Sequence, residues 1–495
     1  MELSVWFFIL SALFLGWSSG ANNASNIFGT AVVSKMLKFR TAAVISGIFV
    51  ILGSVISGGG TTKTLNDLGS VNALAGSFAV AAGAGISIIL MIRSKLLVSS
   101  AQVIVGAIIG WNLFTDSPTD YFSLYKILLS WITSPIIAAV FGFLLFKLMK
   151  ATVLKWKIHL LEFDTYTRFG LILAGALASY SFGANNIANV MGMFVSSVQL
   201  PDLPIAHIFV LNGEQQLFLL GGISIAVGIF TYGNQVINTV SEDFNRISPI
   251  TGFVAVSAEI LVLFLFTSQK LEQFFIRSNL PPVPLVPLST TQAFIGAIIG
   301  TGIAKDPHSV NFKVLGKIAS GWVIAPAVAG LITFVSLFFV QNVFEQKVIL
   351  SEPYELTASV MTELSSEGIR TEAIGSLVNV RFKTKKEFRV ELLQRSRFTK
   401  EQLYKIFSCS IIDSFYIDTN RLYKNFDISL LTPEQLQEIK KQHGEAFNHK
   451  IDFQQALFRS RTVWGAANDT LSTIELHKTM TTLEDLFRVS AASHN

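Results

Sequence analysis

Ten apolar stretches occupy the first 345 residues, and each is close to the length that a helix needs to cross a bilayer. A transmembrane helix takes about 20 apolar residues. The stretches lie near residues 3–33, 41–57, 72–92, 96–114, 125–148, 169–194, 207–230, 250–268, 285–304 and 318–341. Because a segment in lipid must satisfy its own backbone hydrogen bonds, we expect these stretches to be helices. The sequence therefore predicts an all-α polytopic membrane protein in the cell (inner) membrane.

Charged residues are concentrated behind this apolar region. Residues 346–495 hold 20 Lys and Arg and 19 Asp and Glu, whereas the first 345 residues hold 18 and 14. Only 14% of the whole chain is charged, against about 25% in a typical soluble protein. We therefore expect a small soluble domain over 346–495. Val378–Phe382 alternates like a strand and Thr432–Pro433 resembles a capped helix start, so an α+β domain is predicted.

Several classes of protein are excluded by this composition. A chain that is 51% hydrophobic with a net charge of +5 is neither disordered, nor a nucleic-acid binder, nor an ordinary cytosolic enzyme. No nucleotide, metal or nucleophile motif is visible, so we expect no enzyme activity and no cofactor. The basic connecting segments fall on one side of the predicted bundle, which should be cytoplasmic.

The apolar region carries the same motifs twice, in the same order. The first motif reads Gly-Ala-Asn-Asn-x-x-Asn, the second is a Ser-rich segment that runs into Gly-Ala-Ile-Ile-Gly, and the third has Trp four residues before Pro. The pairs are Gly20–Asn26 with Gly183–Asn189, Val98–Gly110 with Leu288–Gly300, and Ser130–Pro135 with Gly321–Pro326. The Gly-rich segment Gly58–Thr64 also resembles Tyr232–Thr239. The chain thus divides into a first transmembrane repeat over 1–168, a second over 169–345, and the domain over 346–495.

Because each repeat has five predicted crossings, an odd number, the second repeat would have the opposite orientation in the membrane to the first. Inverted repeats with interrupted helices are typical of secondary transporters, whose site lies near the midplane between the halves. We therefore expect an inverted-repeat transporter with broken helices, in which the duplicated polar motifs meet.

The polar motifs have the chemistry to hold a small ion inside the membrane. An unsatisfied amide in hydrocarbon costs several kcal/mol, so the Asn residues must face protein, water or a solute. Gly and Asn are poor helix formers, and we expect each Asn motif to break its helix. The N–H groups at a helix N-terminus would then suit an anion, and the exposed carbonyls would suit a cation.

The Ser-rich segments add hydroxyl donors at expected helix starts. Ser99 and Ser289 stand where an N-cap is expected, and Gln102 and Gln292 lie in the next turn. Two such segments facing each other could surround a tetrahedral anion with neutral donors. The alternative is that these Ser, Thr and Asn side chains only hold helices together. Four matched clusters favour a binding site.

These motifs resemble those of the PiT-type inorganic phosphate transporter family, over nearly all of residues 1–345 and none of the C-terminal domain. The resemblance implies an inverted-repeat membrane fold, inorganic phosphate as the substrate, and symport with sodium or protons. A homodimer is left open. It also implies that the motif residues line the substrate site, namely Asn22, Asn23, Asn26, Ser99, Ser100, Asn185, Asn186, Asn189, Ser289, Thr290 and Thr291.

The sequence departs from that family at charged positions. The family motif reads Gly-Ala-Asn-Asp, whereas Asn23 and Asn186 replace the two carboxylates here, and Lys63 falls near a Glu of some relatives. We expect weaker sodium dependence, with Lys63, Gln102, Gln292 and Glu259 as candidates for charge compensation or coupling. Glu259 lies in an apolar run and is the candidate proton carrier. Lys63 could instead be a solvated residue paired with Asp67.

Two other functions are compatible with the sequence. One is transport of a different oxyanion such as sulfate, since neutral donors alone do not separate the two anions. The other is a phosphate sensor, in which the membrane part binds phosphate and the C-terminal domain signals.

Overall fold

The computed structural model describes most of the chain in detail. Its described residues are 3–69, 71–117, 119–156, 159–195, 197–198, 200–205, 209–244, 248–278, 280–281, 283–306, 312–350, 352–426, 428–458, 461–464 and 470–489. The chain forms two compact units. The first comprises Met1–Phe275 and Pro282–Ile349, and the second comprises Ile276–Pro281 and Leu350–Asn495. The first unit therefore takes in both predicted transmembrane repeats except for residues 276–281.

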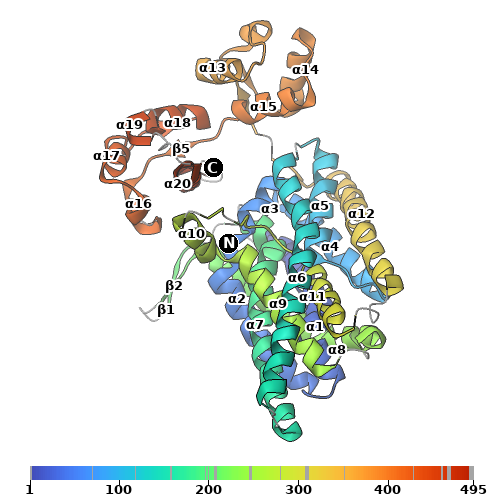
Figure 1. The fold of residues 1–495 in the computed structure, drawn as a ribbon. Helices are drawn as coiled ribbons and strands as arrows, with labels where there is room; N and C mark the ends of the chain where they lie inside the picture. Colours follow the sequence, from blue (N-terminus) through green and yellow to red (C-terminus); the bar gives the residue numbers. More distant parts are fainter. Residues whose placement is uncertain are drawn as a thin grey trace. The chain divides into compact units, whose positions relative to one another are not determined.

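The first unit has one helix for each of the ten predicted apolar stretches (Figure 1), as expected for an all-α membrane protein. The first repeat contains α1 (Leu3–Val33), α2 (Phe39–Ser57), α4 (Leu74–Arg93), α5 (Ser100–Thr115) and α6 (Tyr121–Trp156). The second contains α7 (Leu160–Val195), which begins before the predicted boundary between residues 168 and 169, and α8 (Gly213–Phe244), α9 (Pro249–Thr267), α11 (Thr290–Lys305) and α12 (Phe312–Asn342). The connections add η1 (Gly58–Gly60), α3 (Thr62–Leu68), α10 (Gln269–Arg277) and the hairpin of β1 (Leu203–Ile205) and β2 (Phe209–Leu211).

The helices differ in whether they can cross a membrane. Seven described helices are long and apolar enough, namely α1, α2, α4, α6, α8, α9 and α12. The helix α7 has 36 residues but is not among these seven. With 16 residues each, α5 and α11 extend about 24 Å, less than a hydrocarbon core of about 30 Å. The prediction of ten equivalent crossings therefore does not hold for these two short helices.

The two repeats are interlocked and share one hydrophobic core. If α1, α2, α4, α5 and α6 are matched in order with α7, α8, α9, α11 and α12, each packed pair has a counterpart. The helix α1 packs on α8 as α7 packs on α2, and α5 packs on α12 as α11 packs on α6. The pairs α1–α4 and α7–α9 also correspond. The structure thus has the internal symmetry expected of a duplicated unit.

Matched glycines allow the backbones of the two repeats to come close together. A Cβ atom on Gly106 would lie 2.1 Å from the carbonyl oxygen of Pro326, and one on Gly296 would lie 2.2 Å from that of Pro135. Real Cβ contacts are never so short, so only Gly fits at either position. The duplicated Gly of each repeat therefore faces the duplicated Pro of the other, which explains why both motifs occur twice.

The second unit consists of two similar small lobes, a duplication that the sequence analysis missed. In the first lobe, β3 (Tyr354–Glu355) pairs with β4 (Arg381–Phe382); in the second, β5 (Phe415–Tyr416) pairs with β6 (Ala446–Phe447) in the same register. Tyr354 stacks on Phe388 in the first lobe as Phe415 stacks on Phe453 in the second. Each lobe has a hydrophobic core of its own. No described helix of this unit meets the length and hydropathy of a membrane span.

Short helices make up most of both lobes. They are α13 (Ala358–Ser366), η3 (Glu372–Leu377), α14 (Lys385–Arg395), α15 (Lys400–Ser410), α16 (Thr419–Asn425), η4 (Ile428–Leu430), α17 (Pro433–Lys441), α18 (Lys450–Phe458), α19 (Arg461–Trp464) and α20 (Thr470–Phe487). The predicted helix start is confirmed, because Thr432 caps α17 and Pro433 is its first residue. The predicted strand over Val378–Phe382 is reduced to the two residues of β4.

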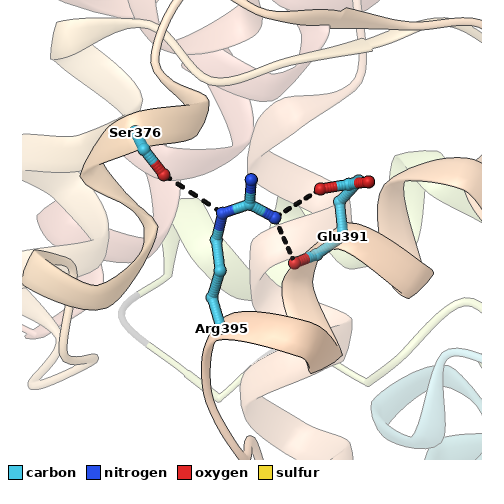
Figure 2. A network of polar contacts seen from close by, with 3 residues as sticks. All are labelled: Ser376, Glu391 and Arg395. Carbon is cyan, nitrogen blue, oxygen red and sulfur yellow. Dashed lines mark hydrogen bonds and ion pairs between the residues drawn. The ribbon is translucent and has the colours of Figure 1, made fainter.

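One polar network ties α14 to the preceding 3-10 helix (Figure 2). The guanidinium of Arg395 donates from Nε to Ser376 Oγ at 3.1 Å and from Nη1 to the Glu391 carbonyl oxygen at 2.8 Å. Nη1 also forms an ion pair with the Glu391 carboxylate. The network fixes the end of α14. Because its groups are partly exposed, it adds little to the stability of the protein.

Candidate functional site

The two Asn motifs lie inside continuous helices. Gly20–Asn26 belongs to α1 and Gly183–Asn189 to α7, and both helices run on for at least six residues beyond the motif. Our prediction that these motifs break their helices is therefore wrong. The glycines serve close packing instead: a Cβ on Gly20 would lie 2.1 Å from the Ile225 carbonyl oxygen. Asn22 and Asn185 donate to carbonyls outside their own helices, and the bond from Asn23 Nδ2 to the Ser19 carbonyl oxygen stays within α1 without interrupting it.

The interruptions occur at the Ser-rich segments. Extended residues 96–99 and 283–289 lead into the short helices α5 and α11. Ser99 Oγ accepts from Gln102 N at 3.3 Å, and Ser289 Oγ accepts from Gln292 N at 3.1 Å. Both serines are thus N-caps, as predicted. Each repeat therefore places one helix N-terminus, with its free N–H groups and partial positive charge, inside the protein.

The first Asn of each motif holds the extended segment of its own repeat. Asn22 Nδ2 donates to the Val98 carbonyl oxygen at 2.8 Å, and Asn185 Nδ2 donates to that of Leu288 at 2.9 Å. Asn185 Oδ1 also accepts from Leu288 N at 2.9 Å. These bonds position the residues directly before both caps, so the Asn motif fixes where the helix N-terminus points.

The second Asn of each motif contacts the opposite repeat. Asn23 Oδ1 accepts from Thr290 Oγ1 at 2.8 Å, and Asn186 Oδ1 accepts from Ser100 Oγ at 2.6 Å. Ser100 and Thr290 are the first residues of α5 and α11. We call these two hydrogen bonds the crossed pair. Through them, each Asn motif meets the helix N-terminus of the other repeat, so the two predicted clusters form one connected site.

The third Asn of each motif completes the network. Asn26 Nδ2 donates to Asn23 Oδ1, and Asn189 Nδ2 donates to Asn186 Oδ1, both at 3.2 Å. Asn26 Nδ2 also lies 3.1 Å from Thr291 Oγ1, which in turn donates to the Val98 carbonyl. The eleven predicted substrate residues are all buried, each at most 3% exposed. None of them faces lipid.

Several polar atoms in this buried network have no hydrogen-bond partner among the described residues. Four are amide oxygens, on Asn22, Asn189, Gln102 and Gln292, and one is the amide nitrogen of Asn186. Gln102 and Gln292 occupy matched positions in α5 and α11. An unsatisfied buried polar atom is costly, so it points to a bound solute, ion or water. The site thus offers both donors and acceptors without any carboxylate.

The two charged candidates, Glu259 and Lys63, differ in how much of their surroundings the structure describes. Glu259 lies in α9, is 2% exposed, and its Oε2 has no hydrogen-bond partner in the described part of the chain. The helix α9 packs against α1, α7 and α11, which carry the polar motifs. Lys63 belongs to α3, but its side chain and that of Asp67 lie outside the described residues. No cluster of three or more His, Cys, Asp or Glu residues suited to a metal occurs in the described part of the chain.

The sequence analysis missed the backbone partners of this site. The carbonyls of Val98 and Leu288 accept from the Asn motifs, yet these apolar residues give no sign of such a role in the sequence. Their position directly before the duplicated serines is the one available signal. The crossed arrangement was also not specified beyond the expectation that the two motifs would meet.

Comparison with known proteins first defines the fold. A solved structure titled "The sodium-dependent phosphate transporter" matches with a TM-score of 0.56 and 21% identity, covering 68% of this chain and 99% of that one. At this identity the likeness shows that the two chains share a fold.

Sequence comparison then gives the family. The profile of the phosphate transporter family matches residues 19–333 and, in a second match, 283–444. The chain therefore belongs to the phosphate transporter family, whose members are permeases and not enzymes. The second match extends past residue 345, where we expected the resemblance to end.

Curated relatives agree with this assignment. A protein of Methanocaldococcus jannaschii, named as a phosphate permease, is 31% identical over 68% of this chain and 97% of its own length. One of Bacillus subtilis, named as a low-affinity inorganic phosphate transporter, is 25% identical over 68% of this chain and 97% of its own. These prokaryotic sources support the cell membrane as the location. Neither name favours a sensor or a carrier of another oxyanion.

Proposed function

We propose that this protein is a secondary transporter that moves inorganic phosphate across the membrane, coupled to sodium ions or protons. The crossed pair is the observation that carries the proposal. A site made jointly by two interlocked repeats can open to one side or the other when the repeats move against each other. If these side chains served only to pack helices together, we would expect the matched oxygens of Gln102 and Gln292 to have hydrogen-bond partners among the described residues, and they have none.

The substrate would be held by neutral donors. The N-termini of α5 and α11 offer backbone N–H groups, each with the partial positive charge of a helix end. Ser100 and Thr290 add hydroxyls that can turn from the Asn oxygens toward an anion, and Thr291 adds one that can turn from the Val98 carbonyl. Such groups suit the oxygens of phosphate from both repeats at once.

The unpartnered amide oxygens favour phosphate over sulfate. Phosphate near neutral pH keeps at least one proton, so its hydroxyl can donate to an acceptor such as Gln102 Oε1 or Gln292 Oε1. Sulfate carries no proton at this pH and would leave these oxygens unpaired. Sites that hydrogen-bond a donor on their ligand discriminate strongly against analogues that lack it.

The coupling would differ from that of relatives with two motif carboxylates. Asn23 and Asn186 use their oxygens as carboxylates would, but they bring no negative charge to hold a cation. Glu259 is buried on a helix that packs against both helices that carry the Asn motifs, and we propose that it carries the coupling proton. Lys63 would offset part of the charge of the anion. Sodium dependence is then weak.

Uptake of labelled phosphate into proteoliposomes tests these points together. The full chain is reconstituted, and uptake is driven by a sodium gradient, by a proton gradient, or by neither. We expect phosphate uptake that follows the proton gradient, persists when choline replaces sodium, and resists an excess of sulfate. A strict sodium requirement would reject the proposed coupling, and equal competition by sulfate would reject phosphate selectivity. Analytical ultracentrifugation in detergent would test the homodimer.

A further inference from the structure

A second feature of the membrane unit involves none of the motif residues described above. A cavity of about 370 Å³ is lined by Phe146, Met149, Lys150 and Val153 of α6, Phe163 of α7, Ile250 and Thr251 of α9 with Ser248 before it, and Lys305 of α11. These four helices pack against one another in the pairs α6–α11, α6–α9, α7–α9 and α9–α11. The cavity therefore lies at a junction where both repeats meet.

The position of the lining residues places the cavity at one end of the helices. Lys150 is in the last two turns of α6, Phe163 is in the first turn of α7, and Lys305 is the last residue of α11. Ser248 directly precedes α9 and caps it by accepting from Thr251 N at 3.3 Å. Helix ends lie where hydrocarbon gives way to headgroups. The cavity thus faces the interfacial layer of the membrane.

The lining combines an apolar wall with two cations. The wall consists of Phe146, Met149, Val153, Phe163 and Ile250. Lys150 and Lys305 are both exposed, and no residue of the described lining is acidic. The hydroxyls of Ser248 and Thr251 lie 2.9 Å apart and add hydrogen-bonding groups. Basic cavities between transmembrane helices on the cytoplasmic side bind lipid headgroups, and the basic connecting segments predict that side here.

We propose that this cavity binds one anionic phospholipid. The two ammonium groups and the hydroxyls would hold the headgroup phosphate, and the apolar wall would hold the start of an acyl chain. A free phosphate ion does not fit as well, because it would gain nothing from the five apolar side chains and would lose its water. A lipid bound here would join α6 and α7 to α9 and α11.

Native mass spectrometry of the full-length protein, released from detergent with added lipid, tests the proposal. The probes are phosphatidylglycerol and the zwitterionic phosphatidylcholine of the same acyl chains. The double variant K150Q/K305Q removes both charges from the cavity. K147Q is the matched control, because Lys147 is exposed on the same helix and does not line the cavity.

We expect wild type and K147Q to bind phosphatidylglycerol alike, and the double variant to bind it about 30-fold more weakly. Each Lys near an anionic lipid contributes about 1 kcal/mol, and 1.4 kcal/mol is a factor of ten. The single variants should each lose about fivefold, and phosphatidylcholine binding should not change. Unchanged phosphatidylglycerol binding by the double variant, an equal loss in K147Q, or displacement of the lipid by inorganic phosphate would overturn the proposal.

Discussion

The two Asn residues that replace the motif carboxylates should respond differently when a carboxylate is restored. Asn23 Nδ2 donates to the Ser19 carbonyl oxygen at 3.0 Å, whereas Asn186 Nδ2 has no partner among the described residues. In N23D a carboxylate oxygen would face that carbonyl, so one hydrogen bond is lost and two acceptors are brought together. In N186D nothing equivalent is lost. Both variants keep an oxygen for the crossed pair.

The expected difference in stability follows from these contacts. Leaving a buried group without its partner costs about 1–3 kcal/mol. The cost of burying a new charge applies to both variants, so most of it cancels when they are compared. We therefore expect the free energy of unfolding of N23D to be about 1–3 kcal/mol below that of N186D. Urea unfolding in mixed micelles, followed by circular dichroism, measures this difference.

The effect of sodium on N186D tests the same contacts through function. The carboxylate of N186D lies in a site with unpartnered amide oxygens, so it should attract a small cation. We expect sodium, but not choline, to stabilise N186D and to stimulate its phosphate uptake more than that of wild type. The reasoning would be refuted if N23D were at least as stable as N186D. It would also be refuted if sodium affected wild type and N186D equally.

Three other changes test separate parts of the account. Gly20→Ala should lower the free energy of unfolding by about 1–3 kcal/mol or more through overpacking against Ile225. Gly29→Ala on the same helix should be neutral or stabilising, because its added Cβ would have no neighbour closer than 3.6 Å. Unfolding curves of the two variants measure this difference. Glu259→Gln should flatten the pH profile of phosphate uptake while phosphate binding is kept, and an unchanged profile would remove Glu259 from the coupling path. Deleting the chain from Leu350 should leave substantial uptake in proteoliposomes, and complete loss with a folded membrane unit would favour the sensor.

Much of the fold could be predicted because hydropathy and duplication are strong signals. Each apolar stretch became a helix, and the repeated motifs identified which helices correspond. The error at Asn22 and Asn23 arose because helix propensity was given too much weight. In a packed interior, tertiary hydrogen bonds and the close approach of Gly20 to Ile225 outweigh a propensity of about 1 kcal/mol.

The remaining features depend on contacts that no local pattern records. The crossed pair joins residues 86 and 267 positions apart in the sequence, and nothing near Ser100 or Thr290 specifies the partner. The lobes of the second unit share a register and an aromatic stack. A local signal of the duplication is a pair of Phe residues six positions apart, Phe382 and Phe388 in one lobe and Phe447 and Phe453 in the other. Side-chain function at Ser99 and Ser289 was predictable, since an N-cap is a local arrangement.

Phosphate binding by variants of the crossed pair tests most directly whether both repeats build one substrate site. Binding of labelled phosphate to purified protein is measured for S100A and T290V, with T290S as the variant that restores the hydroxyl. Ser87→Ala is the control, because Ser87 is also buried and donates to the Gly83 carbonyl of its own helix. We predict that S100A and T290V each bind phosphate about 10- to 100-fold more weakly, as expected for a lost bond to a charged ligand, while T290S and S87A bind as wild type does. Binding that is the same in S100A, T290V and S87A would contradict the account.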